Sequence, residues 1–326
     1  MLLVTGGAGF IGSNVVASLN EAGRTDVAVN DTLGNDDKWR NLQKRRLADF
    51  VPPADLFRWL DGRKLDAVIH MGAISDTTAR DGDAVMESNF RLSLRLLDWC
   101  SDTRTPLIYA SSAATYGDGD QGFADDNSPA ALARLKPMNL YGWSKHLFDL
   151  AVLDRAAKGG KLPPQWAGLK FFNVFGPNEY HKGEMMSLIA KRFDDAKAGR
   201  PVTLFKSHRA GVADGEQRRD FIYVDDAVGV VRWLLDTPKV CGLFNVGTGK
   251  AESFRDLVTA MFAALGRVPD IRYVEMPETI RGKYQYFTQS SVENLRRAGY
   301  NAGFMPLTES VKRYVVSYLD TPDRYR

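Results

Sequence analysis

Short apolar runs alternate with amphipathic segments through the first half of the chain. The runs have the length of buried strands: LLVT (2–5), DVAVND (26–31), LDAVIHMGA (65–73), PLIYASS (106–112) and LKFFNVFGP (169–177). Between the runs, apolar residues recur at helical spacing, as at Ile11, Val15 and Leu19. Strands that alternate with helices in this way predict an α/β fold with a doubly wound, parallel, Rossmann-type sheet.

The alternation loosens after Pro177. Helical patterns such as SLIAKRFDDAKAG and FRDLVTAMFAALG then stand among irregular stretches, and GLFNVGTG (242–249) is expected to return one strand to the main sheet. We therefore expect a dinucleotide-binding domain over 1–173, to which 220–248 returns. A smaller, discontinuous substrate-binding lobe is expected over 174–219 and 249–326.

Composition narrows the class of protein. The chain has 326 residues, 44% apolar and 25% charged, with a net charge of +3. This mild excess suits a small anionic substrate and does not indicate nucleic-acid binding. Charges interrupt every apolar run before the ~18 residues that a membrane span needs. Two cysteines without metal-ligand spacing and no basic leader favour a cytoplasmic protein.

The first forty residues carry a dinucleotide-binding signal. Gly7, Gly9 and Gly12 give G-x-G-x-x-G between a predicted strand and a predicted helix, where backbone N–H groups can approach a pyrophosphate. The next strand ends at Asp31, where a carboxylate can bind the adenosine ribose. Asp31 favours NAD, whereas the basic run from Lys38 to Arg46 offers charges that would neutralise a 2′-phosphate.

A second signal lies in NLYGWSK (139–145). Tyr141 and Lys145 are four residues apart, so a helix places both on one face. A neighbouring ammonium lowers the pKa of a phenol, and the pair would then act as a general base. Ser111 and Ser112 at a predicted strand end offer hydroxyls to the reacting alcohol or ketone. The alternative is a surface lysine beside a half-buried tyrosine.

These segments together resemble the extended short-chain dehydrogenase/reductase family, which acts on nucleotide sugars. The resemblance rests on TGGAGFIG, HMGA, SSAATYG, YGWSK, NVFGP, RDFIYVDD and NVGTG. It implies catalysis by Ser112, Tyr141 and Lys145. It also implies a cofactor site made of Gly6, Gly9, Phe10, Ile11, Gly12, Asp31, Thr32, Lys38, Met71, Gly72, Ala73, Ile74, Ser75, Asn89, Tyr141, Lys145, Val174 and Lys182.

Two further segments indicate which branch of the family the chain resembles. Ala113 and Ala114 stand where related dehydratases carry an Asp-Glu pair, which disfavours dehydration. NVFGPNEYHKGEM (173–185) and RGKYQYFTQ (281–289) resemble the ADP-glyceromanno-heptose 6-epimerases of lipopolysaccharide core biosynthesis. That resemblance implies NADP (with NAD as the alternative), a homo-oligomer, and Lys182 as a second catalytic acid/base facing Tyr141. The alternatives are a UDP-hexose 4-epimerase and a non-catalytic dinucleotide sensor.

The resemblance also implies a set of substrate contacts, and the chain departs from the pattern at some of them. The expected contacts are Ser112, Asn173, Glu184, Lys191, Phe205, Lys206, Ser207, His208, Arg219 and Tyr284. Arg219 suits a diphosphate, because a guanidinium binds phosphate oxygens in pairs. Glu184 replaces a small serine, Lys191 replaces a histidine, Pro53 replaces a phosphate-binding lysine, and the 206–220 loop is longer than expected.

Overall fold

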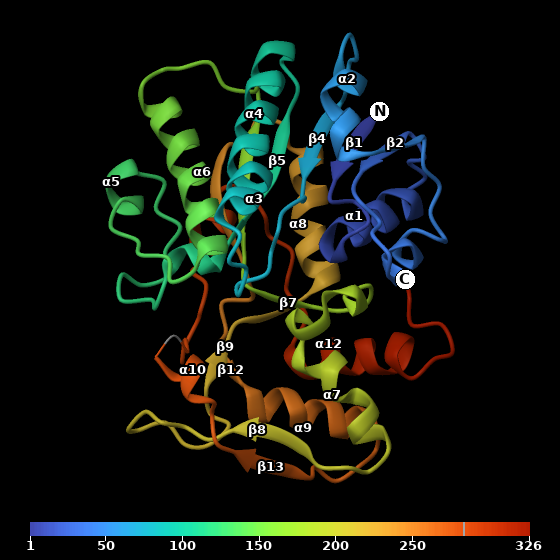
Figure 1. Ribbon diagram of the computed structural model, residues 1–326, viewed down its shortest axis with the longest axis vertical. Coiled ribbons are helices and arrows are strands. Elements are labelled where there is room, and N and C mark those ends of the chain that lie inside the picture. Colours follow the sequence, from blue (N-terminus) through green and yellow to red (C-terminus); the bar gives the residue numbers. More distant parts are fainter. Residues whose placement is uncertain (283) are drawn as a thin grey trace.

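A seven-stranded parallel sheet forms the larger part of the molecule (Figure 1). The computed structural model describes residues 1–282 and 284–326. The strands lie in the order β11 (Gly242–Val246), β6 (Trp166–Phe171), β5 (Leu107–Ser112), β4 (Ala67–His70), β1 (Leu2–Thr5), β2 (Val27–Asn30) and β3 (Asp49–Val51). The chain order reverses between β1 and β4, and in open parallel sheets such a reversal marks the crevice where ligands bind. The predicted fold class is confirmed.

Alternate residues of each strand enter different cores. Leu2 and Val4 pack in a core with α1 (Phe10–Glu21) and α8 (Val224–Asp236), whereas Leu3 points to the opposite face. There it packs with helices that include α2 (Leu56–Leu60), α4 (Leu92–Thr103) and α6 (Leu140–Ala157). Strands buried on both faces explain why their sequences are apolar runs.

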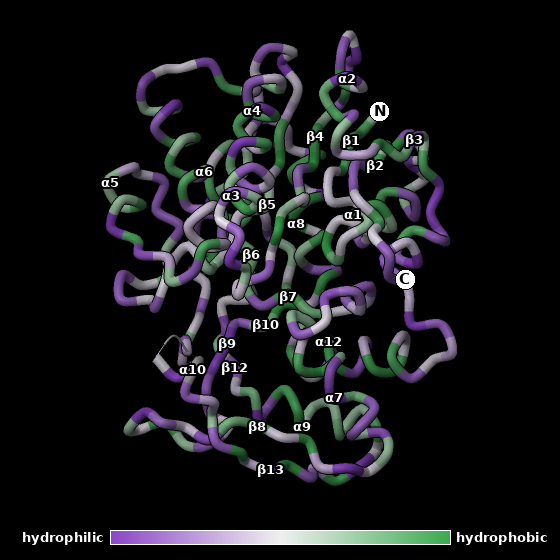
Figure 2. The backbone as a smooth tube through the Cα atoms, viewed as in Figure 1, coloured by the Kyte–Doolittle hydropathy of each residue, from purple (hydrophilic) through white to green (hydrophobic). Residues whose placement is uncertain are grey.

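A second part of the molecule has a core of its own, below the sheet in Figure 1. Here α7 (Leu188–Lys197), α9 (Phe254–Ala264) and α12 (Leu307–Tyr314) pack with the parallel pair β8 (Val202–Phe205) and β13 (Ile271–Val274). Figure 2 shows hydrophobic segments along the sheet strands and α9, and hydrophilic segments at β9 (Arg218–Arg219) and in the outer loops. We call this part the lobe.

Short elements connect the sheet and the lobe. β7 (Asn173–Phe175) pairs with β10 (Phe221–Tyr223), and β9 pairs with β12 (Glu252–Ser253). The predicted run 169–177 is therefore two strands in different sheets. The remaining elements are η1 (Asp37–Asn41), η2 (Pro53–Asp55), α3 (Gly82–Met86), η3 (Glu87–Arg91), η4 (Ala113–Tyr116), α5 (Pro129–Leu132), η5 (Tyr180–Met185), α10 (Glu278–Arg281), α11 (Glu293–Arg297) and η6 (Val315–Leu319).

Part of the segment expected to belong to the lobe packs against the sheet domain. Leu295 and Tyr300, which fall in the segment that we assigned to the lobe, pack in the core of α1 and α8. Among residues 1–282 and 284–326, no helix combines the length and the apolar character needed to cross a bilayer.

Candidate active site

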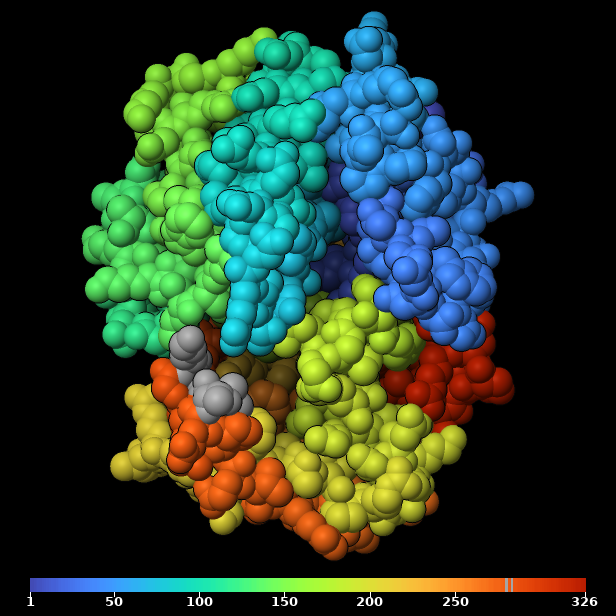
Figure 3. All heavy atoms as spheres, in the orientation of Figure 1, coloured from blue at the N-terminus to red at the C-terminus, as the bar shows by residue number. Residues whose placement is uncertain are grey.

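Two cavities meet at the carboxyl ends of the sheet strands. The first, of about 540 Å³, lies over the ends of β1, β4 and β5, and we call it the sheet-end cavity. The second, of about 740 Å³, reaches from the sheet into the lobe, and we call it the lobe cavity. In Figure 3 a hollow opens between the blue N-terminal segment, the cyan segment after β4 and the yellow-green η5. The residues that line both cavities are Ser112, Tyr141, Phe171, Phe172, Val174, Lys182 and Met185. We call this shared region the junction.

Glycines allow a close backbone approach at the floor of the sheet-end cavity. Gly6 has φ +65°, and a Cβ added there would lie 2.5 Å from the Gly72 nitrogen. The backbone segments that follow β1 and β4 therefore lie almost in contact, which only a glycine at position 6 permits. α1 starts at Phe10 without an acidic residue in its first turn, and its N-cap, Gly9, makes no side-chain cap. Its free N–H groups and dipole favour an anion such as a pyrophosphate.

Asp31 follows β2 at the edge of this cavity. Its carboxylate accepts the Ala8 N–H at 2.8 Å and pairs with the Lys38 Nζ at 2.6 Å. The ion pair compensates the charge of the acid, and both side chains line the sheet-end cavity. Thr32 does not line it, although its N–H donates to Asp31 at 2.7 Å. The structure therefore gives Thr32 a supporting place behind the acid.

The loop after β4 forms one wall of the sheet-end cavity through residues 71–76. Asn89, expected as a cofactor contact, is fully buried behind this loop. Its side chain accepts the Ile74 N–H at 2.8 Å and donates to the Ile74 carbonyl at 2.9 Å. In this structure Asn89 shapes the wall and does not line the cavity.

α6 carries the Tyr141–Lys145 pair. Asn139 caps the helix by accepting the Gly142 N–H at 2.8 Å, so the helix begins just before Tyr141. Lys145 is 2% exposed and its Nζ donates to the Ala110 carbonyl at 2.7 Å. Burial lowers the pKa of Lys145 to about 8, and the Asp149 carboxylate opposes that effect.

The pKa of Tyr141 differs from the sequence-based expectation. Burial raises it, a hydrogen bond with the Ser112 hydroxyl opposes that change, and the Asp149 carboxylate adds to it. The raised pKa contradicts the expectation that Lys145 lowers it, because the Lys145 ammonium donates to the Ala110 carbonyl instead. A neutral phenol at neutral pH is suited to donate a proton.

Of the two candidate serines, Ser112 lines both cavities, whereas the Ser111 hydroxyl donates to the buried Asp149 carboxylate.

Lys182 reaches the junction from η5. Its Nζ lies 5.1 Å from the centroid of the Phe10 ring, and burial lowers its pKa, against the opposing charge of the Glu179 carboxylate. A desolvated lysine of this kind exchanges protons closer to neutral pH than a surface lysine does. The structure thus brings two proton-exchanging groups, Tyr141 and Lys182, to one place from separate elements.

His181 was not among the expected cofactor contacts, yet it also lines the sheet-end cavity. Its Nδ1 lies 3.2 Å from the Asn41 amide nitrogen, which links η5 to η1. Burial and the Lys38 charge lower its pKa to about 4, so the imidazole is neutral at neutral pH. Its place beside Lys182 in HKG was the available signal.

Arg219 is a buried cation in the lobe cavity. It is 7% exposed, and its guanidinium lies 5.3 Å from the Tyr284 ring and 5.6 Å from the Phe254 ring. Burial lowers its pKa, and no carboxylate pairs with it among the residues that the structure describes. A guanidinium in this state is a ready site for an anion such as a diphosphate.

The other expected substrate residues fall into two groups. Asn173, Phe205 and Tyr284 line the lobe cavity, as do Glu184 and Lys191. Lys206, Ser207 and His208 do not. Lys206 and His208 instead pair with Glu275 on the lobe surface, at 2.8 Å and 3.3 Å.

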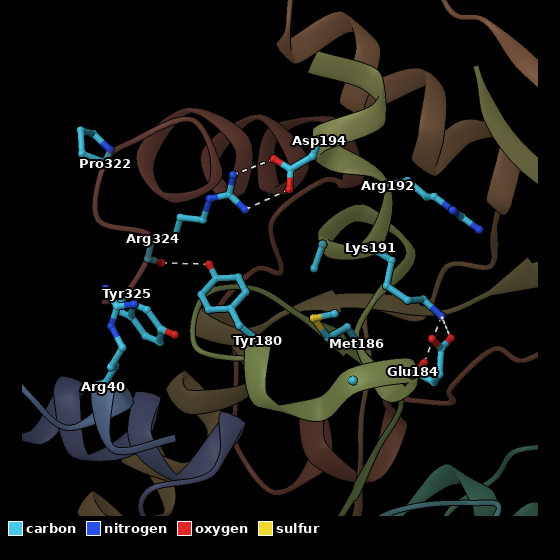
Figure 4. A pocket seen from close by; sticks show the side chains of 12 residues that line it. Arg40, Tyr180, Glu184, Met186, Lys191, Arg192, Asp194, Pro322, Arg324 and Tyr325 are labelled. Atoms are coloured by element: carbon cyan, nitrogen blue, oxygen red, sulfur yellow. Dashed lines mark hydrogen bonds and ion pairs between the residues drawn. The ribbon is translucent and has the colours of Figure 1, made fainter. Parts of the chain in front are cut away.

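Glu184 and Lys191, two of the departures from the family pattern, form an ion pair at 3.7 Å. They stand between the lobe cavity and an outer groove of about 640 Å³ on the other side of η5, shown in Figure 4. Lys191 also donates to the Glu184 carbonyl at 3.0 Å. The two changed side chains are thus partners in the structure.

The fold and the two cavities define a dinucleotide-dependent enzyme of the epimerase and dehydratase type. Residues 2–247 match the model of the NAD dependent epimerase/dehydratase family, and the chain belongs to this family. The cofactor class is therefore a nicotinamide dinucleotide, and the predicted family is confirmed.

Individual relatives are more specific. An ADP-L-glycero-D-manno-heptose-6-epimerase of Nitratidesulfovibrio vulgaris is 51% identical over 330 residues, covering 100% of both chains. The crystal structure of the Helicobacter pylori ADP-L-glycero-D-manno-heptose-6-epimerase is 28% identical with a TM-score of 0.76, covering 96% of this chain and 94% of that one. The Thermus thermophilus UDP-glucose 4-epimerase in complex with NAD is 26% identical with a TM-score of 0.73, covering 96% and 97%.

Proposed function

We propose that the protein inverts C6 of an ADP-glyceromanno-heptose by transient oxidation. The observation that carries the proposal is the junction, where Tyr141 and Lys182 line the same space from α6 and η5. Inverting a carbinol requires that hydride leaves one face of the carbon and returns to the other. Two acid/base groups on different elements can serve both orientations of the sugar, whereas a simple dehydrogenase needs only one.

The cofactor fits the sheet-end cavity. The Gly6–Gly72 approach and the start of α1 suit the pyrophosphate, Asp31 suits the adenosine ribose, and Lys145 suits the nicotinamide ribose. When bound, the nicotinamide ring supplies reversible removal of hydride from the carbinol carbon. We propose NADP, because Lys38 neutralises the acid that would otherwise repel a 2′-phosphate. Mass spectrometry of the dinucleotide released on denaturation tests this choice, and NAD would contradict it.

The residues of the chain move the protons. One of Tyr141 and Lys182 takes the C6 hydroxyl proton as the 6-ketone forms, and Ser112 donates a hydrogen bond to that oxygen. Arg219 holds the diphosphate, so the sugar can turn about a fixed end. After the turn, the other residue returns a proton to the oxygen. The lowered pKa of Lys182 and the neutral phenol of Tyr141 suit these exchanges.

The test is to mix the purified protein with ADP-D-glycero-D-manno-heptose and follow C6 by NMR in D₂O. We expect inversion without deuterium at C6, because a hydride that never leaves the site does not exchange with solvent. Unchanged sugar with folded, cofactor-loaded protein would contradict the proposal. The UDP-hexose alternative predicts instead that UDP-sugars, and not ADP-sugars, raise the melting temperature.

Two variants test the roles of the acid/base pair. Tyr141→Phe and Lys182→Met each remove one proton-exchanging group, and we expect each to lower kcat by ~10²–10⁴-fold. The dinucleotide content after purification should stay near that of the wild type. Lys197→Met, which changes an exposed lysine on α7 that lines neither cavity, is the matched control and should keep the wild-type kcat. A Lys182→Met enzyme of normal kcat would remove Lys182 from the mechanism.

A further inference from the structure

We infer that Asp149 and Lys170 act as a positioning pair behind the junction, holding the Ser112 strand end in place against the α6 helix that carries Tyr141 and Lys145. This inference rests on the proposed function. Both side chains are 0% exposed, and the Lys170 Nζ lies 2.6 Å from the Asp149 Oδ2. Neither residue lines a cavity, so they can act on the reaction only through other groups.

The pair connects the elements that supply the reacting groups. Asp149 lies on α6 one helical turn after Lys145 and two turns after Tyr141, and therefore on the same face. Lys170 lies on β6, which pairs with β5 so that Ser111 stands beside it. The ion pair thus joins α6, which carries Tyr141, to β6, which lies beside β5 and its residue Ser112.

Hydrogen bonds connect the pair to Ser112 on one side and to the preceding residue, Ser111, on the other. The Lys170 Nζ donates to the Thr115 hydroxyl at 2.8 Å, and that hydroxyl donates to the Ser112 carbonyl at 2.8 Å. On the other side, the Ser111 hydroxyl donates to the Asp149 Oδ2 at 2.6 Å. A closed ring of buried polar groups therefore holds the end of β5 to α6.

Stability alone gives a weak reason for such a pair. Removing two charges from water is costly, and replacing a buried ion pair by apolar residues of similar volume is often neutral or stabilising. Lys170 interrupts the apolar strand LKFF, where an apolar residue would pack without that cost. What the pair supplies is a fixed register between Ser112 and Tyr141, because charge-assisted bonds are short and directional.

The carboxylate also acts on Lys145. Among the residues that the structure describes, the charged and titratable groups near Lys145 include Tyr141, His146 and Asp149 on α6, His70 at the end of β4, Lys170 on β6, and Lys182 across the cavity on η5. Of these, the Asp149 carboxylate raises the pKa of Lys145 and so opposes the effect of burial. Without it, the Lys145 ammonium loses its proton at a lower pH.

The mildest test is at Thr115. Thr115→Val keeps the shape but removes the hydroxyl that joins Lys170 to the Ser112 carbonyl, and Thr115→Ser restores it. We expect Thr115→Val to lower kcat by about 10-fold, less than the ~10²-fold that a 1 Å misplacement costs. KM should change by less than about 2-fold, and Thr115→Ser should recover most of the rate. Equal kcat in Thr115→Val and wild type would overturn the inference.

The stronger test removes both charges with Asp149→Leu/Lys170→Met. We expect kcat to fall by ~10²-fold with the dinucleotide retained, and the loss of activity with rising pH to begin at a lower pH. The matched control is Asp98→Asn/Arg155→Gln, which removes a 2.7 Å ion pair from the far end of α6. We expect the control to keep the wild-type pH profile. Should the double variant not fold, the Thr115 variants decide.

A readout without substrate separates this inference from the proposed function. NMR of lysine-labelled protein, with the Lys145 signal assigned by Lys145→Arg, gives the titration midpoint of its ammonium. We expect the midpoint near pH 8 in the wild type and lower in Asp149→Leu/Lys170→Met. If the wild type leaves the heptose unchanged, the proposed function fails while this shift still supports the pair. An unshifted midpoint together with an unchanged pH profile overturns the inference.

Discussion

His70 is a buried histidine whose two ring nitrogens are both bonded. Its Nε2 lies 2.9 Å from the Ser93 hydroxyl, which already donates to the Asn89 carbonyl and must accept here. Nε2 therefore carries the proton, and Nδ1 accepts from the Thr5 hydroxyl at 2.6 Å. Burial and the Lys145 charge lower the pKa of His70 to about 3. The ring is neutral in the folded protein and packs the end of β4.

This neutral imidazole predicts acid sensitivity. The pKa of His70 is about 3 folded and ~6.5 unfolded, so between these values the unfolded chain binds more protons. Stability should therefore fall as the pH drops from ~6.5 towards 3, by up to a few kcal/mol. His181, with a pKa of about 4, adds to the loss in the same direction.

Urea unfolding between pH 7 and pH 4 measures the effect. His70→Gln cannot titrate, and we expect its free energy of unfolding to fall less steeply with pH than that of the wild type. Ser101→Ala, which removes a buried hydroxyl that does not titrate, should keep the wild-type slope. Equal slopes in all three proteins would contradict the assignment of the proton uptake to His70.

At the residue scale, the local sequence identified the side chains that line the cavities more reliably than the buried side chains that hold those residues in place. Tyr141, Lys182 and Arg219 stand in short motifs, and all three line a cavity. Asp149 and Lys170 lie outside any motif, although a lysine within an apolar strand needs a partner and was a usable signal. Lys206 and His208, expected as substrate contacts, lie outside the lobe cavity because pairing of β8 with β13 brings them to Glu275, 69 and 67 residues away in sequence.

At the scale of elements, the start of α6 fixes the orientation of Tyr141. We expect Asn139→Ala, which removes the cap on the Gly142 N–H, to cost ~1 kcal/mol of stability. Fraying of the first turn should also lower kcat, because Tyr141 is the second residue of the helix. Asn139→Asp keeps an accepting oxygen and should restore both. Ser128→Ala, which removes the cap of α5, should affect stability but not kcat. The measurements are chemical unfolding and steady-state kinetics.

The strands of the main sheet were predictable because each is a continuous apolar run buried on two faces. The short strands were not. β7 and β10 have three residues each, and their pairing joins segments almost fifty residues apart in the chain. The run 169–177 divides after Phe171, where the chain leaves the main sheet to pair with β10. Local patterns contain no signal for such non-local pairing.

For the molecule as a whole, residues 321–326 join the lobe to the sheet domain. Arg326 pairs with Asp225 at 2.6 Å and with Glu21 at 2.8 Å. Arg324 pairs with Asp194 at 2.7 Å, and its carbonyl accepts the Tyr180 hydroxyl at 2.9 Å, as Figure 4 shows. The segment therefore contacts α1, α7, α8 and η5, and η5 carries Lys182.

Removing this connection should weaken the attachment of the lobe to the sheet domain and lower the stability of the protein. Arg326→Met breaks both ion pairs of a side chain that is 13% exposed. We expect a loss of about 1–2 kcal/mol and a melting temperature lower by roughly 2–6 °C, with faster proteolysis between sheet and lobe. Arg200→Met, which breaks an exposed pair with Asp195, should change the melting temperature by less than ~1 °C. Calorimetry and timed proteolysis are the measurements, and equal melting temperatures in the two variants would contradict this role.

The Glu184–Lys191 contact has a consequence for evolution and for engineering. Each charge alone would alter the electrostatic potential that the proposed, negatively charged sugar nucleotide would meet on entering the cavity, whereas the two charges together nearly cancel there. Substitutions at positions 184 and 191 should therefore co-vary among homologues. A chimaera that imports only one of them would carry an electrostatic imbalance that neither parent has.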